Sequence, residues 1–299
     1  MKIPQLNNEF FSRLETSALN VGAELAGFFG GKHLVKTYGQ TVEFADFREY
    51  MLGDDIRRID WNLYSRFEKY FLKLFTDERR MHTRIFLDCS ASMAKPETAK
   101  AEYGICFAAA LGFLSVHNMD KLSIRLMQGD KANNPFGTII GKNAFFRSVG
   151  ELQNIEFEDE TDIEKAIIGC DDQGSNDGLT VIISDFFTDS NWKKAVDYLC
   201  YKKRRVLLVQ IMTPEDADPT YTGRVTLIDS ESEDISDERN MKLRITRGMQ
   251  EAYYRALTDF LADIKAFCIS RNADFISVRT DTPVDKAVFG QLMNIGVME

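Results

Sequence analysis

This sequence of 299 residues has few of the residue types from which several common classes of site are built. Its three histidines, His33, His82 and His117, are isolated from one another. Its five cysteines are odd in number, lie far apart and include no Cys-x-x-Cys spacing. These absences argue against a disulfide framework, a zinc site and a catalytic site based on histidine, and the cysteine usage is that of an intracellular protein.

Basic charge, proline and long apolar runs are also scarce. The 37 Lys and Arg against 46 Asp and Glu give a formal net charge of −9, whereas a general nucleic-acid binder needs a basic face to neutralise phosphates. With 22 Phe and only 6 Pro, extensive disorder is excluded. The first residues do not form a signal peptide, and the longest apolar stretch, 104–116, is shorter than the ~20 residues of a transmembrane helix. We therefore expect a soluble cytoplasmic protein with no transmembrane segment.

Apolar residues in regular patterns dominate the chain from residue 83 onward. Strand patterns lie at 83–88, 121–127, 179–185, 204–212 and 274–280. Helix patterns lie at 97–117, 143–152, from 161, and at 192–201, 245–270 and 284–292. This alternation predicts an α/β fold with right-handed crossovers and a mainly parallel sheet that has helices on both faces. We expect this domain to cover residues 81–299, with an exposed polar excursion around 214–242.

Residues 1–80 are expected to form a separate N-terminal module. An amphipathic helix is predicted over 9–29, followed by strand patterns at 41–47 and 71–75 around a turn at Gly53. The stretch 43–66 alternates acidic and basic residues with large aromatics.

That alternating stretch has two interpretations. Arginine pairs bidentately with carboxylates, so the charges can clamp a small folded unit together. Trp and Arg also dominate binding hot spots, so the same stretch can be a docking face for a partner. The residues of such a docking face would be Arg48, Asp54, Asp55, Arg57, Arg58, Asp60 and Trp61.

Hard oxygen ligands follow two of the predicted strands. Asp88, Ser90 and Ser92 occupy alternate positions after the first strand, and Asp185 follows the strand 179–185. Between them, Thr161 begins a predicted helix. Ligands bind outside the carboxyl ends of parallel strands, and carboxylate and hydroxyl oxygens suit Mg²⁺. Each of these residues alone could equally be a helix cap or a turn residue, so their joint occurrence carries the prediction.

The order D-x-S-x-S-M, then Thr-Asp, then I-S-D resembles the von Willebrand factor A domain and its metal-ion-dependent adhesion site (MIDAS). The resemblance implies a von Willebrand A-like fold. It also implies that Asp88, Ser90, Ser92, Thr161 and Asp185 bind Mg²⁺ or another divalent cation, directly or through water. With these few protein ligands, at least one coordination position stays open.

The upstream pattern is more selective. E-F-x-D-x-R-x-Y-x-x-G-D-D-x-R-x-I-D-W, at 43–61, resembles a bacterial family of unknown function whose members accompany MoxR-type AAA+ ATPases. The similarity extends from about Gly39 to the C-terminus, although Thr41 stands where the family often has a second glycine. It implies a non-enzymatic module that acts with such an ATPase in chaperone-like maturation or assembly of client proteins. An acidic residue of a partner would complete the metal shell.

An enzymatic alternative stays open: a metal-dependent phosphoesterase or phosphotransferase that uses Asp88 and Asp185. Two observations argue against it. A second acid is expected two positions after an aspartyl nucleophile, but Ser90 stands there, and no glycine-rich phosphate-binding motif occurs. Cys89 lies between two ligand positions, and a thiol beside a carboxylate is expected to have a raised pKa and to be inert.

Overall fold

Two compact units make up the chain in the computed structural model, which describes residues 3, 5–20, 35–36, 43–77, 81–94, 99–170, 178–219, 223–227 and 241–296. One unit comprises Met1–Phe29 and Met81–Glu299, and the other comprises Gly30–Arg80.

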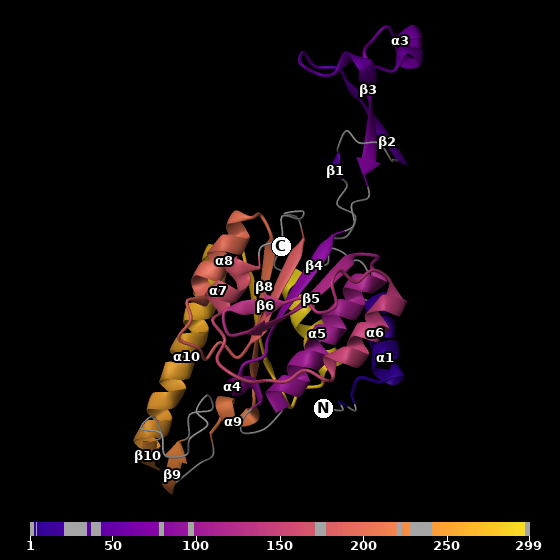
Figure 1. The fold of residues 1–299 in the computed structure, drawn as a ribbon. Helices are drawn as coiled ribbons and strands as arrows, with labels where there is room; N and C mark the ends of the chain where they lie inside the picture. The colour runs from indigo at the N-terminus through magenta and orange to yellow at the C-terminus, as the bar shows by residue number, and fades with distance from the viewer. Residues whose placement is uncertain are drawn as a thin grey trace. The chain divides into compact units, whose positions relative to one another are not determined.

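The larger unit is built on a six-stranded sheet in the order β11-β8-β7-β4-β5-β6 (Figure 1). Its strands are β4 (His82–Asp88), β5 (Lys121–Gln128), β6 (Lys131–Asn133), β7 (Leu179–Ser184), β8 (Arg205–Met212) and β11 (Asp274–Arg279). Neighbouring strands are parallel except for β5 and β6, which pair antiparallel. The predicted α/β fold with a mainly parallel sheet is confirmed, and β6 is an edge strand that the sequence patterns missed.

Helices cover both faces of this sheet (Figure 1). The core of one face includes α1 (Asn8–Asn20), α5 (Ala99–His117), α6 (Lys142–Leu152) and α11 (Val284–Gly296). The core of the other face includes α7 (Ile163–Gly169), α8 (Trp192–Tyr201) and α10 (Arg247–Ser270).

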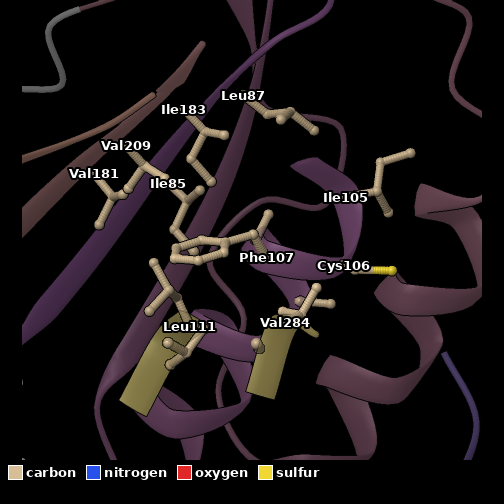
Figure 2. Packing of buried hydrophobic residues seen from close by; sticks show 14 of the residues in the cluster. Ile85, Leu87, Ile105, Cys106, Phe107, Leu111, Val181, Ile183, Val209 and Val284 are labelled. Atoms are coloured by element: carbon tan, nitrogen blue, oxygen red, sulfur yellow. The ribbon is translucent and has the colours of Figure 1, made fainter. Parts of the chain in front are cut away.

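The strands supply both cores because successive side chains point to opposite faces. In β4, Ile85 and Leu87 pack in the α5 core, while Phe86 packs in the α8 core. Figure 2 shows Phe107 and Leu111 of α5 against the first of these faces. Strands that are buried on both faces read as continuous apolar runs, and such runs are what made the central strands predictable.

Helix α5 lies in the middle of its layer and is buried almost all round. By length and composition alone, it is the one helix in the described part of the chain that could cross a membrane, but 89% of its most apolar window is buried inside the fold. This is weak evidence for a membrane span, because the core helix of a soluble protein meets the same criteria.

Helix α1 belongs to the larger unit. Phe11 lies 5.3 Å from Phe113 of α5 and 5.8 Å from Phe145 of α6, measured between ring centroids. The Lys142 ammonium contacts Glu15 at 2.8 Å. The sequence patterns had grouped this helix with the N-terminal module; residues 21–29 of the predicted helix lie outside the described residues.

The polar excursion contains regular structure that the sequence patterns did not predict. Helix α9 (Pro214–Ala217) follows β8, and β9 (Gly223–Leu227) pairs antiparallel with β10 (Met241–Ile245) in a separate two-stranded sheet. The acidic run 229–240 lies outside the described residues.

The smaller unit is an antiparallel sheet in the order β1-β3-β2. Its elements are β1 (Val35–Lys36), β2 (Glu43–Glu49), the 3-10 helix η1 (Ile56–Arg58), α3 (Trp61–Phe67) and β3 (Phe71–Asp77). The strands predicted at 41–47 and 71–75 correspond to β2 and β3, with residues 41–42 outside the described residues.

Candidate metal centre

The two carboxylates of the predicted metal site come from neighbouring parallel strands. Asp88 is the last residue of β4, and Asp185 directly follows β7. Because β4 and β7 pair in parallel, their carboxyl ends meet at one edge of the sheet. Both side chains are buried, so the sheet brings two acidic groups together away from water.

Asp88 accepts hydrogen bonds on both carboxylate oxygens. The Ser90 amide donates to Oδ1 at 3.0 Å, and the Ser184 hydroxyl donates to Oδ2 at 2.6 Å. Burial raises the pKa of the Asp88 carboxyl, the Ser184 hydrogen bond opposes this shift, and the nearby charge of Asp185 raises the pKa further. A divalent cation would relieve this effect of the Asp185 charge on the buried Asp88 carboxyl.

Of the three predicted hydroxyl ligands, Thr161 reaches the Asp88 carboxylate, and Ser90 and Ser92 lie beside each other just after Asp88 in the chain. The Ser90 and Ser92 hydroxyl oxygens are 3.0 Å apart in the short turn that begins α4 (Ala91–Ala94). A hydrogen bond from Thr161 also lowers the pKa of Asp88, so the Thr161 side chain reaches this group. Thr161 is not the N-cap of α7. Asp162 caps this helix by accepting a hydrogen bond from the Lys165 amide at 3.0 Å.

Asp185 is paired with a lysine that the sequence reasoning missed. Lys100 Nζ lies 2.7 Å from Asp185 Oδ2, and the two side chains are 9% and 2% exposed. The Phe187 amide donates to Asp185 Oδ1 at 3.1 Å. On the outer side, Lys100 Nζ lies 3.8 Å from Asp216 Oδ2. The one available signal for Lys100 in the sequence was a lysine at the start of an otherwise apolar helix.

Ser184 was also missed as a site residue, although it stands at the end of a predicted strand. Its hydroxyl joins β7 to Asp88 and accepts a hydrogen bond from the Phe186 amide at 3.0 Å. On β8, Gln210 donates to the Asp185 carbonyl at 3.2 Å, and its buried Oε1 has no hydrogen-bond partner among the described residues.

The chemistry of this donor set fits a hard divalent cation such as Mg²⁺, which prefers carboxylate and hydroxyl oxygens. Within the described ranges, no three His, Cys, Asp or Glu side chains gather where they could hold a metal. A cation at this edge would therefore depend on Asp88 and Asp185, with Ser90, Ser92 and Thr161 supplying hydroxyl oxygens. Two charged ligands leave room for water or a ligand from another molecule.

Cys89, between these positions, is buried, and its thiol lies 3.6 Å from the Leu87 carbonyl oxygen. Burial raises the pKa of this thiol well above its usual value, and the charge of Asp88 raises it further. The expected raised pKa is confirmed. Because the thiolate is the reactive form of cysteine, Cys89 is a packing residue at neutral pH.

The acidic residues of the predicted docking segment have local structural roles. One Arg48 amino group donates to both oxygens of Asp54, at 2.8 and 2.9 Å, and Asp54 also accepts from the Met51 amide. Asp55 caps η1, and Asp60 caps α3. These contacts agree with the interpretation of residues 43–66 as a small folded unit that is held together by its charged side chains.

Other members of that segment face outward. Trp61 is 58% exposed, α3 buries none of its residues, and Arg57 is exposed. The side chain of Arg58 lies outside the described residues. The docking face therefore stays a prediction, and Trp61 rather than the acidic residues is its strongest candidate.

The chain is similar to proteins of unassigned role. The family model described as Protein of unknown function DUF58 matches residues 46–258. An uncharacterized protein of Mycobacterium tuberculosis is 26% identical over 273 residues, which are 90% of this chain and 84% of that protein.

Among solved structures, the conserved hypothetical protein BatB from Bacteroides thetaiotaomicron matches with a TM-score of 0.42 and 14% identity, over 73% of this chain and 100% of that one. A mussel byssus protein, proximal thread matrix protein 1 with a zinc-occupied MIDAS motif, matches with a TM-score of 0.35 and 9% identity, over 44% of this chain and 36% of that one. Both TM-scores are below 0.5.

Proposed function

This chain belongs to the family described as Protein of unknown function DUF58, and we propose that it is a non-enzymatic, metal-dependent protein-binding module. In this proposal Mg²⁺, or another divalent cation, is held by Asp88, Ser90, Ser92, Thr161 and Asp185. The observation that carries the proposal is the meeting of two buried carboxylates at the ends of β4 and β7, with the Thr161 side chain at Asp88 and the Ser90 and Ser92 hydroxyls beside each other.

The bound ion would serve as a bridge to another protein. An open coordination position is filled by an aspartate or glutamate of the partner, so binding requires the ion. Without the ion, that carboxylate would approach Asp88 and Asp185 with no opposite charge between them. The coupling is reciprocal, so the partner tightens ion binding by the same factor, and about 5–150-fold is typical of coupled sites.

The proposed partners are a MoxR-type AAA+ ATPase and client proteins, in chaperone-like maturation or assembly. This part of the proposal is supported by the resemblance of residues 43–61 to the family that accompanies such ATPases. A cytoplasmic location is part of the same proposal and is supported by five free cysteines.

Hydrolysis of phosphoesters is the less favoured function. A nucleophile at this edge needs a general base, and the two described histidines lie elsewhere. His82 begins β4, at the opposite end of the strand from Asp88, and His117 ends α5. Assay of the Mg²⁺-loaded protein against generic phosphoesters tests this directly. Turnover that disappears in Asp88→Ala would overturn the non-enzymatic proposal.

Titration calorimetry with Mg²⁺ tests the metal centre. We expect Asp88→Asn and Asp185→Asn to abolish detectable binding. The amide keeps the shape of the carboxyl in both variants, but Asp185→Asn also removes the charge partner of Lys100, so circular dichroism must first show that this variant is folded. Asp162→Asn is the matched control, since this acid is in the same loop as Thr161 but caps α7. Unchanged affinity in both site variants would show that the centre is misplaced.

Affinity capture with and without EDTA tests the bridging role. The expected result is an ATPase that is captured by the native chain in Mg²⁺ and lost both in EDTA and with Asp88→Asn. A partner that binds equally in all three conditions would show that docking does not use the metal.

A further inference from the structure

Lys100 is a buried cation at the edge of the candidate metal centre. Its side chain is 9% exposed, and its ammonium lies 2.7 Å from Asp185 Oδ2. Lysine is almost never this buried unless it is paired. The ring of Phe187, with its centroid 6.0 Å from the ammonium, is a further close neighbour of the charge.

The local secondary structure does not explain this position. Lys100 is the second residue of α5, and the positive end of a helix dipole disfavours a cation there. Removing an ammonium from water is also costly unless a partner compensates. The ion pair with Asp185 is therefore what holds the lysine in place, and the ammonium contacts one oxygen of a carboxylate that is proposed to bind the metal.

We propose that Lys100 is a fixed counter-ion of the metal centre that sets its charge. It weakens the binding of a free divalent cation, and it makes the loaded centre prefer an anionic ligand at the open position. This inference rests on the proposed function and adds to it a reason why the partner group is a carboxylate.

The charge balance explains both effects. With a divalent cation bound, the two carboxylates of Asp88 and Asp185 cancel the charge of the ion, so the Lys100 ammonium leaves one positive charge. An incoming carboxylate neutralises that charge, whereas water or a hydroxyl does not. In the absence of such a ligand, the ammonium and the ion repel each other across Asp185.

Asp216 moderates this balance from outside. Its carboxylate lies 3.8 Å from the ammonium, but its side chain is 29% exposed, and Oδ2 accepts the Thr213 amide at 2.9 Å. Solvent therefore screens Asp216 more than it screens the buried Asp185.

The test measures Mg²⁺ affinity by calorimetry, in sodium acetate and in sodium chloride of equal ionic strength, with acetate as the carboxylate probe. For Lys100→Met we expect Mg²⁺ to bind about tenfold tighter or more in chloride, because a like charge is gone. In the native chain, acetate should tighten Mg²⁺ binding relative to chloride, and in Lys100→Met most of this acetate effect should be lost. A lysine with only a structural role would not change these two quantities in opposite directions.

Two further variants keep the test decisive. Lys100→Arg retains the charge and should keep the acetate effect. Asp216→Asn leaves the buried pair intact and can still accept the Thr213 amide, so it should fold even if Lys100→Met does not. It should weaken Mg²⁺ binding in chloride by a few-fold and enlarge the acetate effect, because the lysine is then less neutralised.

Each outcome decides the matter. Tighter Mg²⁺ binding with a smaller acetate effect in Lys100→Met supports the inference. Mg²⁺ binding that is detectable in Lys100→Met but not in the native chain supports it as well. If the native chain binds Mg²⁺ in an Asp88-dependent way, but Lys100→Met is no tighter and Asp216→Asn is unchanged, Lys100 is only structural and the metal centre stands. Absence of Mg²⁺ binding in all of these proteins overturns the inference and the proposed function together.

Discussion

The Ser184 hydroxyl donates a hydrogen bond of 2.6 Å to Asp88 Oδ2, and so joins the ends of two neighbouring parallel strands. The same oxygen accepts from the Phe186 amide, which fixes the direction in which the hydroxyl points. Ser184 is therefore a positioning residue for Asp88, since it holds the carboxyl without being one of the predicted ligands.

Replacing Ser184 with alanine should weaken Mg²⁺ binding about tenfold, because groups that orient metal ligands typically contribute 10–100-fold to affinity. Ser184→Thr retains the hydroxyl and should bind Mg²⁺ nearly as well as the native chain. Calorimetry on both variants checks this. Equal affinity of Ser184→Ala and the native chain would mean that Asp88 needs no such support.

Asp120 should make the fold less stable as the pH rises. Its side chain is 5% exposed, it accepts the Met81 amide at 3.0 Å, and its Oδ2 has no hydrogen-bond partner among the described residues. Burial raises the pKa of this carboxyl from 3.8 to about 7, partly offset by the Met81 hydrogen bond. The folded state therefore holds a proton that the unfolded state has lost between those values. This stabilisation is complete below pH 3.8 and is lost as the pH rises through about 7.

Urea unfolding at pH 5 and pH 8 tests this dependence. Between these two pH values the native chain should lose about 1–3 kcal/mol more unfolding free energy than Asp120→Asn, which has no titrating group at that position. The same pH dependence in both proteins would show that Asp120 is not the group responsible.

Gly178 should tolerate no side chain. Its φ is +123°, and a Cβ there would lie 2.2 Å from the His82 carbonyl oxygen, where β7 and β4 begin. Gly178→Ala should reduce the unfolding free energy by about 3 kcal/mol or more, since backbone strain and overpacking combine. Gly150 lies in α6 with nothing within 4 Å of its added Cβ, so Gly150→Ala should stabilise by about 0.5–1 kcal/mol. Urea denaturation of both variants gives the comparison.

Trp61 should affect binding without affecting folding. It is 58% exposed on a helix that buries no residue, so Trp61→Ala should change unfolding free energy by less than about 0.5 kcal/mol. If residues 43–66 dock a partner, the same variant should weaken capture of that partner by about 2 kcal/mol or more. Leu72→Ala, at a buried position of β3, is the structural control and should destabilise the small unit. Capture that is unaffected by Trp61→Ala would leave the segment with a structural role alone.

The central strands and the helices between them could be predicted because their buried positions are occupied by apolar residues at regular spacing. Strand β6 could not, since Lys131–Asn133 is too short to show a period and depends on pairing with β5. Strands β9 and β10 were missed for a related reason. Within the described part of the chain they pair only with each other, and the acidic run between them dominates the composition. The amphipathic pattern of α1 predicted a helix with one buried face, but no local feature shows that α5 and α6 cover it.

At the site, the proximity of the two strand-end acids could be predicted because parallel strand order places their ends together. Asp88 and Asp185 needed only β4 and β7 to be neighbours. Lys100 and Ser184 needed more: a lysine at a helix start is usually solvated, and a serine before an aspartate has no preferred partner. Their roles arise from burial and from long-range contacts, which a local sequence pattern does not reveal. Lys100 is separated from Asp185 by 85 positions, and Ser184 from Asp88 by 96 positions.

The packing of α1 against α5 and α6 also sets an order of events during synthesis. Phe10, Phe11 and Leu14 leave the ribosome long before the rings of Phe113 and Phe145 that cover them. At translation rates of roughly 5–20 residues per second, this apolar helix face waits roughly 7–30 s, while the whole small unit is made in between. Helix α1 can therefore dock only after α5 and α6 have been made, although it is synthesised before both.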